Sequence, residues 1–203
     1  MRRIGAIVVS LGRGGALSGL LRVSGFIDAV LAWFGRIAAW AGLLLVLVVV
    51  YDVVSRYAGV PKPFGLNSTK IQESEYWLHS VLFAFMIGYA YTRQAHVRID
   101  LVRESLPLRV KYMIEMLGCL IFLIPYACLA TYYCASYAYT SFLEDEVSKS
   151  VIGLSNIWIL KATMPIMFAL MGLAGVSQFL KSLAGYTGAL PREAAVTTLG
   201  GDH

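Results

Sequence analysis

Hydrophobic residues along the chain gather in four long runs that polar stretches separate. The runs lie at roughly 37–56, 75–92, 110–135 and 157–181, and each comes close to the 20 or so apolar residues that a helix needs to cross a bilayer. Because backbone polar groups in lipid must be satisfied within their own segment, runs of this length are expected to be helices. The pattern predicts an all-α membrane protein with four transmembrane helices.

The stretches between and after these runs are typical of connectors. The stretch YAGVPKPFGLNSTKIQ, after the first run, is rich in proline and glycine and predicts a loop. The stretch YTSFLEDEVSKSVIGLSN, before the fourth run, is polar and acidic. Residues 184–203 are small and polar, as in a flexible tail. The membrane domain is therefore expected to span residues 37–183.

The N-terminal segment, residues 1–36, combines a basic start with a short apolar piece, MRRIGAIVVSLG. A signal peptide begins in this way, but Arg13 and two glycines interrupt the apolar piece and no clear cleavage site follows, so we expect the segment to be retained. Apolar residues at helical spacing then alternate with Arg22, Asp28 and Arg36. This mixed surface predicts an amphipathic helix lying in the membrane interface.

Composition and charge agree with a membrane protein and suggest its orientation. Hydrophobic residues make up 58% of the chain and charged residues only 14%, whereas soluble domains carry about 25% charged residues. The net charge of +5 would suggest a nucleic-acid partner in a soluble protein. Here twelve of the 17 Lys and Arg residues fall on one side of the predicted membrane. The positive-inside rule then places both termini in the cytoplasm and leaves no reason to expect nucleic-acid binding.

No motif for catalysis or metal binding is visible, and no cofactor is expected. The three cysteines lie in one apolar run and do not form a CxxC pair. A haem-carrying anchor of a redox enzyme is the alternative from an enzyme class. His79 and His96 belong to one predicted helix, about 25 Å apart at 1.5 Å per residue, and His203 is terminal. This arrangement argues against bis-histidine haem and leaves His/Met ligation open.

Ionisable residues near the ends of the runs are candidate functional positions, since such groups in a membrane protein are often functional. Asp52 and Arg56 are four residues apart, so they can pair on one helix face. The candidate set at the predicted outer ends is Asp52, Arg56, Glu75, Glu144, Asp145, Glu146 and Lys161. No charge lies at a predicted bilayer centre, which argues against an ion or proton path through this chain.

Small and aromatic residues indicate how the helices pack and where the membrane surface lies. Gly88, Gly172 and Gly175 would let a second helix approach closely. Trp33, Trp40, Trp77 and Trp158 lie near the ends of the runs, as interfacial anchors do.

A dense polar cluster, RQAHVRID at 93–100, directly follows the second run. Its arginines fit an inner-face loop close to anionic lipid headgroups. The charge rule does not explain the order His-Val-Arg-Ile-Asp. We therefore predict that His96, Arg98 and Asp100 fix the cytoplasmic turn and contact a membrane partner or lipid headgroups.

These residues also show a resemblance to a known family. The order Arg56-Tyr57, Glu75, Gly88, HVRID at 96–100 and Leu106-Pro107 resembles the small, DctQ-like membrane subunit of tripartite ATP-independent periplasmic (TRAP) transporters. The later elements Glu146-Val147-Ser148, Gly153-Leu154, Trp158 and Lys161 resemble the same family. The similarity covers roughly residues 30–183.

The resemblance implies a subunit without catalysis or a substrate site, in the inner membrane of a bacterium. The implied partners are a large permease subunit, a periplasmic substrate-binding protein and membrane lipids. The implied function is a fixed scaffold for sodium-driven uptake of an organic acid, in which the outer-end residues brace the helices or help dock the binding protein. A stand-alone four-helix membrane protein remains the second alternative, and no residue names the substrate.

Overall fold

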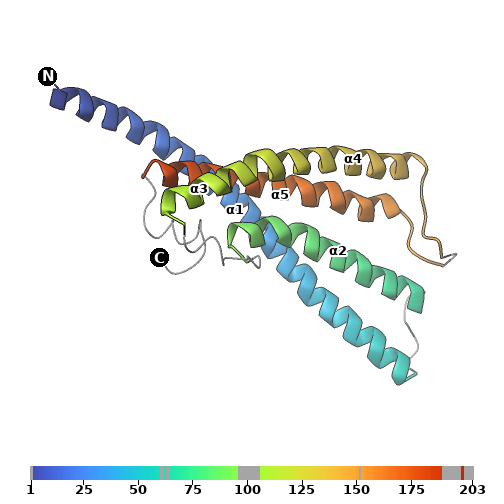
Figure 1. Cartoon of the computed structure of the whole chain (residues 1–203). Coiled ribbons are helices and arrows are strands. Elements are labelled where there is room, and N and C mark those ends of the chain that lie inside the picture. The colour runs from blue at the N-terminus through green and yellow to red at the C-terminus, as the bar shows by residue number, and fades with distance from the viewer. Residues whose placement is uncertain are drawn as a thin grey trace. The chain divides into compact units, whose positions relative to one another are not determined.

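The computed structural model is all-helical over the residues that it describes, which are 2–59, 62, 65–95, 106–150, 152–188 and 198; residues 2–17 are described by their backbone alone. The elements, coloured along the chain in Figure 1, are α1 (Arg2–Tyr57), α2 (Ser68–Thr92), α3 (Leu108–Leu117), the π-helical segment η1 (Gly118–Leu123), α4 (Ile124–Leu143) and α5 (Ile157–Tyr186).

Within the described residues, three stretches are long and apolar enough to cross a membrane: Ser18–Tyr57, Leu108–Leu143 and Ile157–Tyr186. They contain the first, third and fourth predicted spans. The second predicted span lies within α2, which is helical over its whole length but is not apolar enough to qualify. Its first half carries the polar sequence STKIQESE, which lowers its hydropathy. The fold class is therefore confirmed as helical, with three of the four predicted spans supported by hydropathy.

The N-terminal region differs from the expectation of a separate interfacial helix. One continuous helix, α1, runs from Arg2 to Tyr57 through the predicted boundary at residue 36. No proline lies between residues 16 and 57, and the Ser-Gly pairs at 18–19 and 24–25 do not end the helix. The predicted interfacial helix and the first span are thus parts of the same element.

The third span is interrupted by a wide turn. In η1 the backbone N–H of Ile124 bonds to the carbonyl of Cys119, five residues back. Pro125 follows directly, and a proline has no N–H and clashes with the carbonyl four residues before it. The π-helical turn accommodates Pro125 without ending the helix, as such single turns often do within α-helices.

Contacts divide the chain into two compact units. Unit 1 comprises Met1–Ala32, Gly88–Tyr126 and Met171–His203, and unit 2 comprises Trp33–Ile87 and Ala127–Leu170. The core of unit 2 contains many small residues, such as Ala38, Ala84 and Ala138, which let helices approach closely. In unit 1 the buried residues include many polar side chains, among them Ser24, Ser177 and Gln178.

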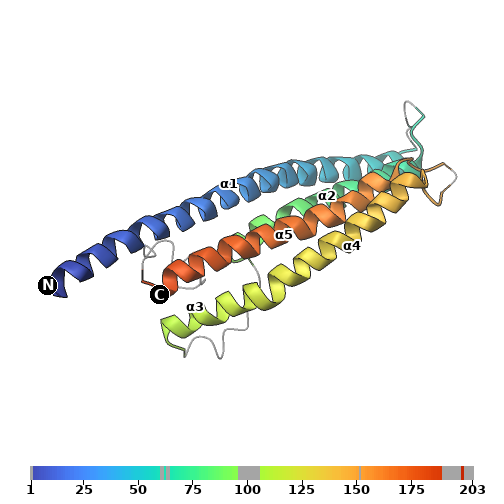
Figure 2. The same cartoon turned by 90° about the horizontal axis from the view of Figure 1, so that it is seen from above.

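The two connectors of unit 2 lie at the same end of that unit (Figure 2). Asn67 begins α2, because its side-chain oxygen accepts a bond of 2.7 Å from the backbone N–H of Lys70. The amide nitrogen of the same side chain donates to the carbonyl of Ile152 at 3.0 Å. One residue therefore both caps a helix and joins the 58–67 connector to the 144–156 connector.

Candidate functional site

Asp52 organises the first polar group of unit 2. Its carboxylate is buried and accepts hydrogen bonds from Arg56, one turn later on α1, and from Lys62 at 3.1 Å. Lys62 also donates to the hydroxyl of Ser68, the first residue of α2, at 2.8 Å. A buried charge is tolerated only when it is paired in this way. The group ties the end of α1 to the start of α2.

Lys161 organises the second polar group of unit 2. Its ammonium pairs with Glu146 and lies 4.0 Å from the centre of the Tyr137 ring. Glu146 also accepts a hydrogen bond of 2.6 Å from Ser141. Hydrogen bonds from Lys161 and then from Ser141 lower the pKa of the Glu146 carboxyl below its ordinary value. This group fastens the 144–156 connector to α4 and α5.

Glu73 holds the same connector from α2, and the sequence did not single it out. One carboxylate oxygen accepts from the hydroxyl of Ser148, and the other accepts from the backbone N–H of Leu154 at 2.5 Å. Gly153 lies so close that an added Cβ would be 2.5 Å from Glu73 Oε1. The carboxylate thus bridges both ends of the short segment between Ser148 and Leu154.

The remaining predicted outer-end acids do not join these groups. The side chains of Glu75, Glu144 and Asp145 form no ion pair with any residue that the structure describes. His96, Arg98 and Asp100 lie outside the described residues. The structure therefore brings together Asp52 with Arg56, and Glu146 with Lys161, from the predicted set.

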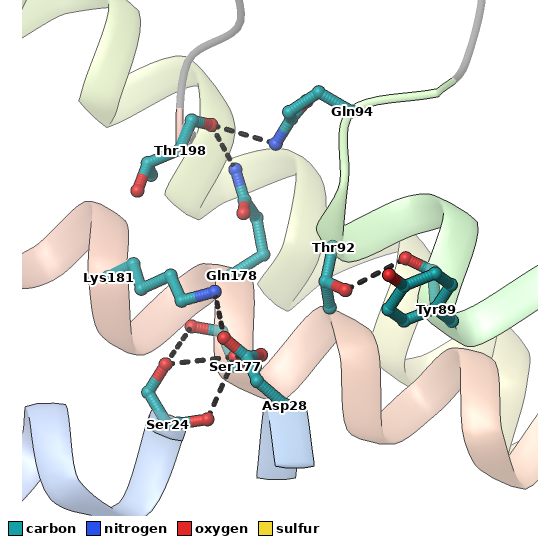
Figure 3. Close-up of polar contacts among 9 residues, drawn as sticks. All are labelled: Ser24, Asp28, Tyr89, Thr92, Gln94, Ser177, Gln178, Lys181 and Thr198. Carbon is teal, nitrogen blue, oxygen red and sulfur yellow. Dashed lines mark hydrogen bonds and ion pairs between the residues drawn. The ribbon is translucent and has the colours of Figure 1, made fainter. Parts of the chain in front are cut away.

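Unit 1 holds a polar cluster between α1 and α5 that the sequence also did not single out. The carboxylate of Asp28 accepts from the hydroxyl of Ser177 at 2.6 Å and pairs with Lys181 at 2.5 Å. The hydroxyls of Ser177 and Ser24 lie 2.9 Å apart. Figure 3 shows the four side chains converging from the two helices. Their spacing of four residues on each helix could have indicated one face, but not the partner helix.

A second set of polar contacts in unit 1 involves Gln178, one residue beyond Ser177. Its amide nitrogen donates to the carbonyl of Thr198 at 2.6 Å and lies 3.1 Å from a carboxylate oxygen of Glu115. Gln94, in the turn after α2, donates to the same Thr198 carbonyl at 2.9 Å (Figure 3). Thr198 is completely buried. Two glutamines therefore hold one residue of the predicted tail.

The predicted packing and anchoring residues have these positions. Gly175 faces the Leu123 side chain, which an added Cβ would approach to 2.9 Å, and Gly88 is buried. Gly172 is half-buried. Trp33 and Trp40 are exposed, while Trp77 and Trp158 are half-buried, and Trp158 packs edge-on against Phe142.

These arrangements are suited to holding helices rather than to chemistry. The described part of the chain holds no group of three or more His, Cys, Asp or Glu side chains that could bind a metal. His79 packs against Phe83, with ring centres 4.7 Å apart. A cavity of about 560 Å³ in unit 1 is lined mainly by apolar side chains beside η1, such as Phe122 and Leu123. Within each unit the ion pairs that form join neighbouring elements, as Glu146 with Lys161 does in unit 2 and Asp28 with Lys181 does in unit 1.

Comparison with known proteins gives a family match. A family profile described as "Tripartite ATP-independent periplasmic transporters, DctQ component" matches residues 45–185. Comparisons with curated proteins and with solved structures found no match. The family match covers more than half of the chain and runs from the first predicted span to the last turn of α5. Together with the helical, span-forming architecture, it establishes that this chain belongs to the DctQ family, the DctQ component of tripartite ATP-independent periplasmic transporters.

Proposed function

We propose that this chain is the small membrane subunit of a TRAP transporter and acts as a fixed scaffold for the large permease subunit. The complex would take up an organic acid, a carboxylate delivered by a periplasmic binding protein, in a sodium-driven reaction. The observation that carries this proposal is the DctQ match over residues 45–185. The chain itself would not carry substrate.

The exposed apolar surface supports a role within a membrane assembly. Many large hydrophobic side chains on the candidate spans are exposed on the protein surface. Trp40, Phe122 and Tyr132 are each at least 70% exposed. A monomeric soluble protein rarely exposes apolar patches of this kind over whole helices. Lipid and a partner subunit are the two environments that such surfaces fit.

We further propose that all four predicted spans cross the inner membrane of a bacterium, including α2, with both termini in the cytoplasm. The distribution of Lys and Arg supports this orientation. On α5, Lys161 and Lys181 are separated by roughly 20 residues, or about 30 Å at 1.5 Å per residue, which matches the hydrocarbon thickness of a bilayer.

In this orientation the polar groups of unit 2 lie at the periplasmic surface, where they brace the helices or help dock the binding protein. His96, Arg98 and Asp100 lie in the cytoplasmic turn and contact the large subunit or lipid headgroups. Gly88, Gly172 and Gly175 serve helix packing, and the four tryptophans anchor the interface. The substrate is recognised by the other two components.

The decisive experiment is co-expression of this chain with a large permease subunit encoded beside it, followed by purification and reconstitution. Proteoliposomes containing both subunits should take up an organic acid only when the binding protein and an inward sodium gradient are supplied. Liposomes containing this chain alone should take up nothing. Uptake by this chain alone, or full uptake by the large subunit alone, would reject the scaffold role.

The cytoplasmic turn is tested in the same system. The double variant His96→Ala and Asp100→Ala should lower the yield of the purified complex if the turn contacts the large subunit. An unchanged yield together with unchanged uptake would remove these residues from the proposed contact.

A further inference from the structure

A small polar cavity lies in unit 1 at the end of α2. It has a volume of about 130 Å³ and is lined by Asp28, Tyr89, Thr92, Arg93 and Lys181. This is many times the 10–15 Å³ or so that one water molecule requires. The cavity therefore has room for a polar group larger than water.

The charges that line this cavity favour an anion. Asp28 is already satisfied, since Ser177 donates to one of its oxygens and Lys181 pairs with the other (Figure 3). Lys181 has three N–H donors and uses one for Asp28, which leaves two. Arg93 forms no ion pair with any described residue and lies over the Tyr89 ring, 5.3 Å from its centre. Among the residues that the structure describes, two cations and one paired carboxylate leave one positive charge uncompensated.

The end of α2 does not oppose an anion as strongly as a bare helix end would. Helix C-termini carry partial negative charge on carbonyls that lack partners. Here the N–H of Ala95 bonds to the carbonyl of Ala90 and the N–H of Gln94 bonds to the carbonyl of Tyr91. Gln94 adopts the left-handed conformation, with φ of 56°, that this type of helix ending requires. The last carbonyls of α2 are therefore largely occupied.

The position of the two cations indicates the source of the anion. Arg93 directly follows the last residue of α2, and Lys181 follows the apolar stretch of α5 that ends in Phe179-Leu180. Basic residues at the ends of apolar helices lie at the headgroup level of a bilayer. Phosphate groups of lipids are concentrated at that level, and Arg and Lys both recognise phosphate through charge-assisted hydrogen bonds.

We propose that this cavity binds the phosphate group of one anionic phospholipid, held between Arg93 and Lys181. Arg93 supplies a planar set of donors, Lys181 supplies a second cation fixed in place by Asp28, and the net charge of the site becomes zero when the phosphate is bound. The inference is independent of substrate transport. It concerns a specific lipid site on residues that do not overlap with the 96–100 turn.

The test uses the full chain, purified in detergent, and compares lipid retention by native mass spectrometry. Arg93→Gln is the informative variant, because Arg93 is exposed and the variant removes no ion pair with a described residue, although it does remove the contact with the Tyr89 ring. Arg109→Gln is the matched control, since Arg109 is an exposed arginine of the same unit that does not line the cavity. Melting temperatures of all three proteins without added lipid should be equal.

Wild type and Arg109→Gln should each retain one phosphatidylglycerol molecule, and Arg93→Gln should bind it at least about tenfold more weakly, as expected for the loss of one charge-assisted contact. Phosphatidylcholine should bind more weakly to wild type, because its choline group is cationic. Equal losses in both variants would show diffuse attraction and overturn the proposal. Displacement of the lipid by millimolar inorganic phosphate would also overturn it, since the site would then take a free anion.

Discussion

Glu73 illustrates how a single carboxylate can fix a connector in a membrane protein. It accepts from Ser148 and from the backbone of Leu154, and both bonds involve a charged acceptor. Such bonds each contribute about 1.5–3 kcal/mol. We expect Glu73→Gln to lower the melting temperature of the purified protein and to increase hydrogen exchange between residues 148 and 154.

Glu75 provides the control for this prediction. It lies two residues further along α2, and its side chain forms no ion pair with a described residue. Glu75→Gln should leave both the melting temperature and the exchange of the connector unchanged. If the two variants behaved alike, the bonds of Glu73 would not be what holds the connector.

The sequence led to Glu75 rather than Glu73 for a physical reason. Both acids lie in the polar start of α2, and hydropathy does not tell which face of that helix meets the 144–156 connector. The same limit applies to Glu146 and Lys161, whose pairing depends on a turn between two helices. Asp52 and Arg56 could be paired from sequence, because their spacing of four residues on one helix is sufficient.

Glu146 should also make the stability of the protein depend on pH. Its folded-state pKa is lowered by hydrogen bonds from Lys161 and Ser141. A carboxyl with a lowered pKa contributes stability above its unfolded pKa of about 4.3, and this contribution is lost as the pH falls through the folded value. The melting temperature of wild type should therefore exceed that of Glu146→Gln at pH 7, and the difference should shrink below about pH 4.3.

Glu144→Gln is the matched variant for this pH series. Glu144 is an exposed acid of the same connector, and its side chain has no ion-pair partner among the described residues. It should follow wild type at every pH. A difference between wild type and Glu146→Gln that stayed constant from pH 7 to pH 3 would contradict the proposed origin of the stability.

At the scale of single elements, the contact between α3 and α5 depends on Gly185. An added Cβ there would lie 2.4 Å from two ring atoms of Tyr112, which is itself almost fully buried. The Gly185→Ala variant must push the two helices apart or displace the ring, and overpacking of this kind costs roughly 1–3 kcal/mol. We expect a clear drop in melting temperature.

Gly25→Ala is the comparison for Gly185→Ala in the same unit. Gly25 lies within α1 and an added Cβ would meet nothing within 4 Å. Because alanine favours a helix over glycine by about 1 kcal/mol, Gly25→Ala should be neutral or slightly stabilising. A loss of stability in Gly25→Ala as large as that in Gly185→Ala would show that close approach to Tyr112 is not the cause.

Element boundaries were predicted where the chain carries a local signal. The start of α5 at Ile157 follows the polar stretch LSN, and the end of α2 at Thr92 precedes the basic cluster. The continuity of α1 past residue 36 was not predicted, because charged residues such as Arg22 and Arg36 indicate a membrane interface but do not end a helix. The π-helical turn before Pro125 was not predicted either, because the hydropathy pattern does not report how a helix accommodates a proline.

At the scale of the whole molecule, hydropathy was sufficient to predict the helical class and three of the spans. The number of membrane crossings depends on α2. Its apolar half, LFAFMIGYAYT, is preceded by several polar residues, so its transfer into lipid is less favourable than that of the other three helices. The four-span topology requires that the two ends of α2 lie on opposite sides of the membrane. If α2 did not cross, its ends would lie on the same side.

Single cysteines in a cysteine-free background distinguish these topologies. Leu66 and Ser155 are exposed connector positions of unit 2, and Ala95 and Thr187 are exposed positions after α2 and α5 in unit 1. In right-side-out spheroplasts, a membrane-impermeant maleimide should label Leu66→Cys and Ser155→Cys at once, but Ala95→Cys and Thr187→Cys only after lysis. Labelling of Leu66→Cys and Ala95→Cys together before lysis would mean that α2 does not cross. The reverse pattern at all four positions would instead place both termini in the periplasm, against the orientation that the Lys and Arg distribution favours.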